Sequence, residues 1–165
     1  MIRFRYFETH IKDEEYMNKM SAKGWNAKKL IEGFWLFTKK EEYSYTYRVY
    51  YFRGMSKEDI QNKIKDLQKE NIEFVSKYSF WGIFRAKKDF QLYNKEEQLK
   101  ICYKIRKPMI IAIILCPIFI IIGMILTFVH KIFILFTCLI LVYYLICVYL
   151  MVGYTKLINS LKETK

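Results

Sequence analysis

Cysteine is missing from the first hundred residues of this 165-residue chain. The four cysteines come later, and Cys116, Cys138 and Cys147 lie inside an apolar run. A domain without cysteine cannot hold an internal disulfide bond, and the sequence contains neither a CxxC motif nor a zinc-ligand spacing. This pattern fits a reducing, cytoplasmic setting and argues against a cysteine-based metal or redox site.

Glycine and histidine are also scarce, with six and two residues. The glycines are dispersed, so neither a GxGxxG nor a Walker pattern for nucleotide phosphates can be written. His10 and His130 have no partner at a motif spacing, and we predict no catalytic residue, no metal and no cofactor. An acidic cluster at residues 13–15 stands where it suits the dipole of a helix better than catalysis.

Charged residues are absent from a long run between Pro108 and Tyr154, except at His130-Lys131. Each half holds about twenty apolar residues, which is enough to cross a hydrocarbon core as a helix. Transporters and proton relays usually keep charged groups at depth, whereas these halves have none. The run therefore predicts a transmembrane helical hairpin that serves as an anchor.

Basic residues flank this run on one side of the predicted membrane. The group before it consists of Lys100, Lys104, Arg106 and Lys107. Lys156, Lys162 and Lys165 follow it, and the turn offers only Lys131, with His130. By the positive-inside rule we expect a multi-pass protein with both termini in the cytoplasm. The first group is also suited to anionic lipid headgroups.

The first 90 residues repeat one pattern of apolar spacing. It predicts strands at 2–7, 25–31 and 34–39 around a helix at 13–23, then strands at 43–52, 73–78 and 81–87 around a helix from Ser56 to near Asn71. Ser56 and Asp59 resemble a capping box. Residues Met17, Met20, Leu36 and Phe37 fall opposite Ile64, Leu67, Ile83 and Phe84 at one fixed offset.

These elements predict an α+β fold, a tandem βαββ repeat arranged as a ferredoxin-like sandwich and followed by the transmembrane hairpin. The pattern leaves open whether the strands form one sheet or two. We expect a cytoplasmic domain at 1–90, a basic juxtamembrane helix or linker at 91–107, the hairpin at 108–155 and a cytoplasmic tail at 156–165.

The aromatic strand at 43–52 is the main candidate for binding. Together with two arginines near the amino terminus it suggests a ligand or partner face made of Arg3, Arg5, Tyr45, Tyr47 and Arg48. The alternative is that half of these aromatic residues form the core. The net charge of +12 suits an anionic partner or simply a lysine-covered surface, and without an RNP-type motif nucleic acid is disfavoured.

Several segments resemble a known family. They are F-R-Y-F, E-E-Y-M-N-K-M-S-A-K-G-W, G-F-W-L-F, Y-T-Y-R-V-Y-Y and Y-S-F-W-G-I-F-R, within residues 2 to 88. They are similar to the domain-of-unknown-function family numbered 2812. The resemblance implies a bacterial protein with a soluble module ahead of membrane helices, in genes often beside PadR-type repressors. It implies no activity and carries over no functional residue.

We therefore expect a protein of the bacterial cell membrane that is not an enzyme. Its cytoplasmic domain would serve as a regulatory or accessory module and act through contact with an unknown protein partner. The alternative is a sensor that holds a small ligand or peptide against the aromatic and arginine face.

Overall fold

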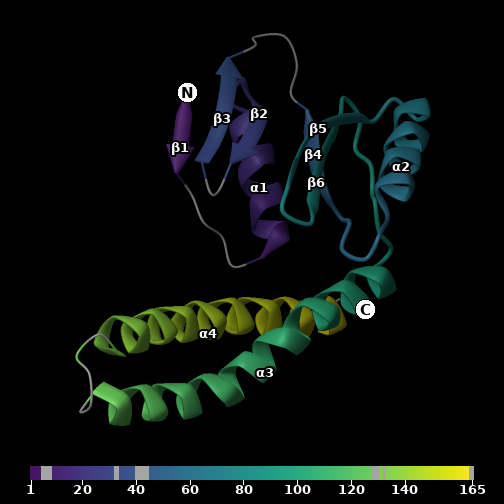
Figure 1. Ribbon diagram of the computed structural model, residues 1–165. Coiled ribbons are helices and arrows are strands. Elements are labelled where there is room, and N and C mark those ends of the chain that lie inside the picture. The colour runs from purple at the N-terminus through teal and green to yellow at the C-terminus, as the bar shows by residue number, and fades with distance from the viewer. Residues whose placement is uncertain (5–8, 32–33, 40–44, 128–130, 132, 164–165) are drawn as a thin grey trace. The chain divides into compact units, whose positions relative to one another are not determined.

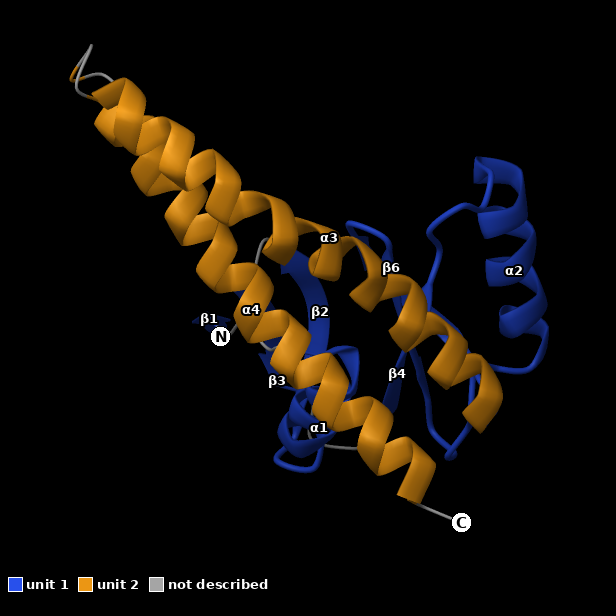
Figure 2. Ribbon diagram, turned by 90° about the horizontal axis from the view of Figure 1, so that it is seen from below, with its two compact units in different colours: residues 1–94 blue, residues 95–165 orange. Residues whose placement is uncertain are grey.

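The computed structural model describes residues 1–4, 9–31, 34–39, 45–127, 131 and 133–163. They form two compact units, residues 1–94 and residues 95–165 (Figure 2). The first unit is α+β and the second consists of two long helices, so the predicted fold class is confirmed. The turn predicted at Glu32-Gly33 lies outside the described residues.

The first unit contains two three-stranded antiparallel sheets, which settles the question that the sequence left open (Figure 1). Sheet A is built from β1 (Ile2–Phe4), β2 (Trp25–Ile31) and β3 (Phe34–Lys39), with α1 (His10–Ser21) between β1 and β2 in the chain. Sheet B is built from β4 (Thr46–Tyr51), β5 (Glu73–Tyr78) and β6 (Trp81–Ala86), with α2 (Lys57–Lys69) after β4. The third strand of each set is central, in the orders β1-β3-β2 and β4-β6-β5.

The two halves are a structural repeat with the offset of 47 residues that relates Met17 to Ile64. Both helices and both hairpins recur at this offset, and β3 and β6 coincide with it at both ends. The irregularity in β2 between Ala27 and Lys29 also recurs, between Phe74 and Ser76 of β5. Each helix is followed by a left-handed residue at equivalent positions, Gly24 (φ 77°) and Asn71 (φ 60°). The predicted tandem βαββ repeat is thus confirmed in its details.

Both faces of sheet B are buried. Its side chains alternate between the two faces, so each face contributes to a different core. On one face Tyr47, Val49 and Ile83 join a core with residues of α1 and sheet A, among them Met17 and Trp35. On the other face the aromatic side chains pack against α2: this second core contains Phe52, Leu67, Ile72, Phe84 and Ala86. α1 therefore lies between sheet A and the β4 side of sheet B, β2 contacts β5 directly, and α2 covers the other face of sheet B (Figure 1).

Local sequence signals explain how α2 begins. Ser56 caps it: the Asp59 N–H donates to Ser56 Oγ (3.1 Å) and the Ser56 N–H donates to Asp59 Oδ2 (3.2 Å), the predicted capping box. α1 begins at His10, three residues before the predicted start, and its N-cap Thr9 makes no capping side-chain bond. The first turn of α1 therefore lacks the signal that marks α2.

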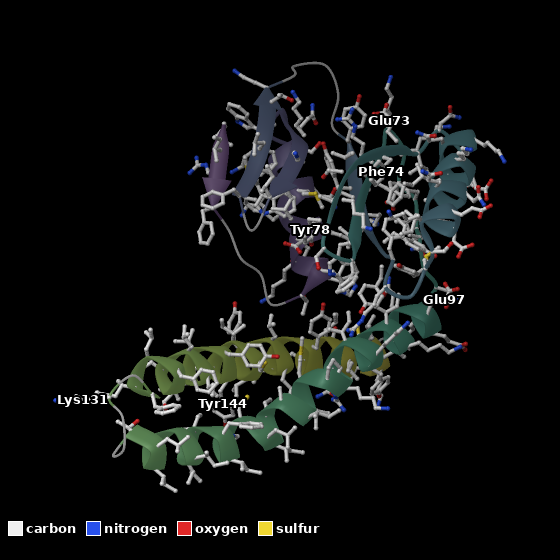
Figure 3. The ribbon with its side chains drawn as sticks, viewed as in Figure 1. Glu73, Phe74, Tyr78, Glu97, Lys131 and Tyr144 are labelled. Atoms are coloured by element: carbon white, nitrogen blue, oxygen red, sulfur yellow. The ribbon has the colours of Figure 1, made fainter. Side chains whose placement is uncertain are left out.

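The second unit is a helical hairpin of α3 (Lys95–Thr127) and α4 (Phe133–Glu163). α3 continues through Pro108, where the sequence suggested a junction between linker and membrane helix. The ends are paired as in an antiparallel hairpin, with Lys162 Nζ 5.7 Å from the ring centre of Tyr103 and Lys131 at the turn (Figure 3). The helices approach closely at Gly123, where a Cβ atom would lie 2.4 Å from Thr137 Oγ1.

Candidate functional site

The free edge of β4 is covered by side chains of α1. The N–H groups of Tyr45, Tyr47 and Val49 point away from β6, because alternate amides of an edge strand do so. They donate to Ser21 Oγ (2.7 Å), Asn18 Oδ1 (2.6 Å) and Glu14 Oε1 (2.8 Å) in that order. A side chain of the helix therefore takes the place of a neighbouring strand at each of these amides.

The side chains of α1 can meet the amides of β4 because the two elements have similar repeat lengths. Four residues of a helix rise about 6 Å and two residues of a strand about 7 Å, so Glu14 and Asn18 can reach successive outward amides. Asn18 also donates from Nδ2 to the Tyr47 carbonyl (3.3 Å). The edge continues at Tyr51, whose N–H donates to the Tyr93 hydroxyl (2.5 Å).

Two carboxyl groups and one imidazole are drawn into this contact. Burial raises the pKa of Asp13 to about 7, although the Tyr78 hydroxyl that donates to Oδ2 (2.9 Å) lowers it in part. Burial likewise raises the pKa of Glu14 to about 7, against the opposing effects of the Val49 N–H and Arg48. His10 stacks on Trp81 with ring centres 4.7 Å apart, and burial lowers its pKa to about 4.

At neutral pH the two carboxyl groups are therefore partly protonated and the imidazole is neutral. A pKa near 7 suits a group that exchanges protons. Here, however, the carboxylate oxygens of Asp13 and Glu14 accept hydrogen bonds from Tyr78 and from the backbone of Val49. Their visible task is to hold α1 against sheet B.

A separate groove of about 890 Å³ opens between the end of α2 and the ends of β5 and β6. Phe74 and Phe90 supply aromatic surface there, and Glu73 is fixed by Arg85 through a bond of 2.8 Å from Nε (Figure 3). The other charged lining residues are Glu70, Lys87, Lys88 and Asp89. The groove can thus offer both charge signs and an apolar wall.

The residues of the predicted binding face occupy different places. Tyr47 is buried in the core, and its hydroxyl accepts from the Ala27 N–H (3.0 Å). Tyr45 is half-buried under the Arg85 guanidinium, 4.4 Å from the ring centre. Arg3 is exposed on sheet A, and Arg5 lies outside the described residues.

Arg48 connects β4 to the segment after β6. It donates to the Phe90 carbonyl (3.1 Å), the Tyr47 carbonyl (3.0 Å) and Asp89 Oδ1 (2.9 Å). Because adjacent strand residues point to opposite faces, Arg48 and Tyr47 cannot present one surface. Of the four described residues of this set, Tyr45 and Tyr47 are in edge-to-face contact with ring centres 6.5 Å apart, whereas Arg3 lies on sheet A and Arg48 points to the opposite face of β4.

The four basic residues predicted to meet lipid headgroups lie in the first four turns of α3. Lys100, Lys104 and Lys107 are exposed, whereas Arg106 is half-buried with its guanidinium 5.5 Å from the Tyr103 ring. They share one end of the hairpin with Lys162 of α4. Sequence reasoning missed Glu14, Asn18 and Ser21, although their spacing places them on one side of α1.

The raised pKa of Asp13 predicts a pH-dependent stability. The folded state holds a proton between pH 4 and 7 that the unfolded state releases, so this contribution is present at low pH and is lost as the pH rises to 7. Asp13→Asn keeps an acceptor for Tyr78 but removes the titration. The full shift corresponds to about 4 kcal/mol, and because the carboxyl group is partly exposed we expect about half of it.

The measurement is urea unfolding of the full chain in detergent micelles from pH 4 to pH 8. Tryptophan fluorescence suits it, because Trp25, Trp35 and Trp81 all lie in the first unit. Relative to Asp13→Asn, the unsubstituted protein should lose about 2 kcal/mol over this range. His10 and Glu14 titrate in both proteins, so the difference reports Asp13 together with the effect of its charge on the pKa of Glu14. A difference that stays constant with pH would contradict the assignment.

Comparison with protein families gives one match. The family model described as "Protein of unknown function (DUF2812)" matches residues 10–115, from α1 into α3. The chain matches no curated protein and no solved structure. The match covers more than half of the chain and extends beyond the segments at residues 2 to 88 that resemble this family. The chain therefore belongs to the DUF2812 family.

Proposed function

We propose that this protein is a membrane-anchored cytoplasmic module that acts by contact with another protein and performs no catalysis. The observation that carries the proposal is the exposure of α3 and α4. Only 11% of the most apolar stretch of α3 and 6% of that of α4 is buried. Apolar surface of that extent is unstable in water and is satisfied by lipid, which both helices are long enough to cross.

The distribution of charge supports the cytoplasmic side for both termini. Lys100, Lys104 and Lys107 lie at the end of the hairpin that also holds Lys162, and Lys131 lies at the opposite end. Basic residues are retained on the cytoplasmic side during insertion. The α+β unit, which ends at Asn94, would then be held at the inner surface by a helix that begins at the next residue.

Single cysteines test this topology in a chain whose four native cysteines are replaced by serine or alanine. A cysteine at Lys131 should react with a membrane-impermeant maleimide in intact cells, whereas one at Lys88 should react only after lysis. An alkaline carbonate wash should leave the protein in the membrane pellet. Equal labelling at both positions, or release by carbonate, would contradict the anchor.

We propose that the protein is not an enzyme because its buried carboxyl groups serve as structural hydrogen-bond acceptors. Asp13 and Glu14, whose pKa values burial raises to about 7, accept hydrogen bonds that join α1 to sheet B. The regulatory or accessory role is proposed because the unit offers exposed surface on sheet A while its aromatic strand β4 is occupied by core packing.

Affinity capture from native membranes tests the protein contact. The full chain should recover a specific partner, and a control chain of residues 95–165 with the same tag should not. This control retains the hairpin and removes the α+β unit. Recovery of the same protein by both chains would assign binding to the helices, and recovery of the bait alone would overturn the proposal.

A second candidate, a sensor of a small ligand or peptide, is favoured by the groove of about 890 Å³ beside Phe74. Pockets for small ligands fall in the same range of size and combine apolar walls with a few polar groups. The ligand would then bind against β5 and the end of α2, away from the residues predicted from sequence.

Thermal unfolding of the full chain in detergent, screened against nucleotides and short peptides, tests this candidate. A ligand of the groove should raise the midpoint by a few degrees, and Phe74→Ala should remove most of the shift. Phe80→Ala is the matched control, because Phe80 is an exposed aromatic residue outside the groove lining. A shift that survives Phe74→Ala would place the ligand elsewhere.

A further inference from the structure

The outer face of sheet A carries an apolar patch. Ile2, Phe4, Ile31 and Phe34 are 67%, 63%, 45% and 48% exposed. The register places Phe34 opposite both Phe4 and Ile31, so the four side chains share one face. The rings of Phe4 and Phe34 are 5.0 Å apart. Contiguous apolar side chains of this kind mark interaction surfaces.

The repeat identifies what covers the same face of sheet B. Adding 47 to the patch residues gives their equivalents, Val49, Tyr51, Tyr78 and Trp81. Tyr51 and Trp81 form the same ring pair as Phe4 and Phe34, with centres 4.7 Å apart.

In sheet B this face receives residues of sheet A and, at Tyr78 and Trp81, the first turn of α1. His10 of α1 stacks on Trp81 (4.7 Å), and the Tyr78 hydroxyl donates to Asp13 (2.9 Å). Both side chains come from the first turn of α1. The equivalent positions in sheet A, Phe34 and Ile31, have the same strand geometry but stay exposed.

The edge strands are equivalent as well. In sheet B, Glu14 accepts from the Val49 N–H, and the position that matches Val49 in sheet A is Ile2. Met1 and Phe37 exchange both backbone bonds (2.8 Å each), so the next amide along, that of Ile2, points away from β3. A carboxylate at this edge would find the donor that Glu14 finds on β4.

The charge of sheet A favours an acidic occupant. Its three strands carry no acidic residue. Their exposed cations are Arg3, Lys28, Lys29 and Lys39, of which Arg3 and Lys39 lie on the opposite face, with Trp35 and Phe37. Lys29 pairs with Leu36 and lies on the outer face beside the patch. Glu32, in the connection between β2 and β3, lies outside the described residues.

We propose that the outer face and free edge of sheet A bind an acidic amphipathic helix of a partner protein, as sheet B binds α1. This inference rests on the proposed function and names the surface through which the protein contact is made. A second copy of the chain is a poorer occupant, because the apolar side of its α2 (Ile60, Ile64 and Leu67) is already packed in the second core. The exposed side of α2 mixes lysines with Glu58, Asp59 and Asp66, and is therefore not an acidic amphipathic surface.

Photo-cross-linking tests the occupant directly. A benzophenone amino acid replaces Phe34 in the full chain, the cells are irradiated, and the adduct is sequenced from native membranes. The expected adduct is a segment of another protein with apolar residues at helical spacing and acidic residues beside them. Lys29→Glu in the same chain should lower the yield about threefold, as for a charge at the rim of an interface. Benzophenone at the exposed Gln61 of α2 is the control position.

Each other adduct overturns the inference. A lipid adduct would mean that the face lies on the bilayer, and an adduct within this chain would mean self-association or intramolecular packing. Equal adducts from positions 34 and 61, or none, would mean that the face binds no helix.

Affinity capture separates this failure from failure of the proposed function. Phe34→Asp should lower partner recovery about tenfold, because an aromatic residue at the centre of an interface carries much of its free energy. Gln61→Asp should leave recovery unchanged. A partner retained by Phe34→Asp leaves the membrane-anchored module standing and removes only the surface named here.

Discussion

The amino-terminal unit depends on how β4 satisfies its outward amides. A strand at the edge of a sheet leaves a row of N–H groups that must find acceptors or water. Here Ser21, Asn18 and Glu14 supply the acceptors from a helix that belongs to the other half of the repeat. This contact joins the two halves into one core. It also explains why carboxyl groups are partly buried there, although burial destabilises the ionised form of a carboxyl group.

The two halves share topology and differ in what each position must do. Ala27 and Phe74 stand at the same point of the repeat beside the same strand irregularity, yet Ala27 fits under α1 and Phe74 faces the groove and α2. Gly82 is the position that corresponds to Trp35 in the repeat. A glycine stands there because a Cβ atom would lie 2.3 Å from the Phe52 ring. In sheet B the rings of Phe52 and Phe84 therefore fill the space that a side chain at position 82 would occupy.

Local patterns predicted most of the fold. Alternating apolar residues located β3 at 34–39, and the fixed offset predicted the repeat, because both signals come from contacts that each element makes regardless of its partner. The start of α1 was misplaced because Thr9 forms no side-chain cap and the acids at 13–15 imitated a first turn. The sequence left open whether 91–107 is a helix or a linker, and in the structure α3 continues through Pro108, where one helical donor is missing.

The candidate site was less predictable than the fold. Arg48 binds Asp89 and the Phe90 carbonyl, 41 and 42 residues away, and no local pattern announces such partners. The aromatic pattern of residues 43–52 leaves Tyr47 either on a binding face or in the core, and no local signal predicts that its hydroxyl accepts from the backbone of Ala27 in another sheet. The polar side of α1 was visible in the sequence, but its meaning depends on an edge strand that folds beside it.

A stack of alternating sheets and helices must end in one sheet face and one helix face, and repeat proteins close such ends with polar caps. At the helix end α2 is a cap of this kind, with Gln61, Lys65 and Lys69 turned to solvent. The sheet end carries Phe4 and Phe34 instead. The stack therefore has a polar helix surface at α2 and an apolar sheet surface at the other end. A further helix could add to it on the outer face of sheet A.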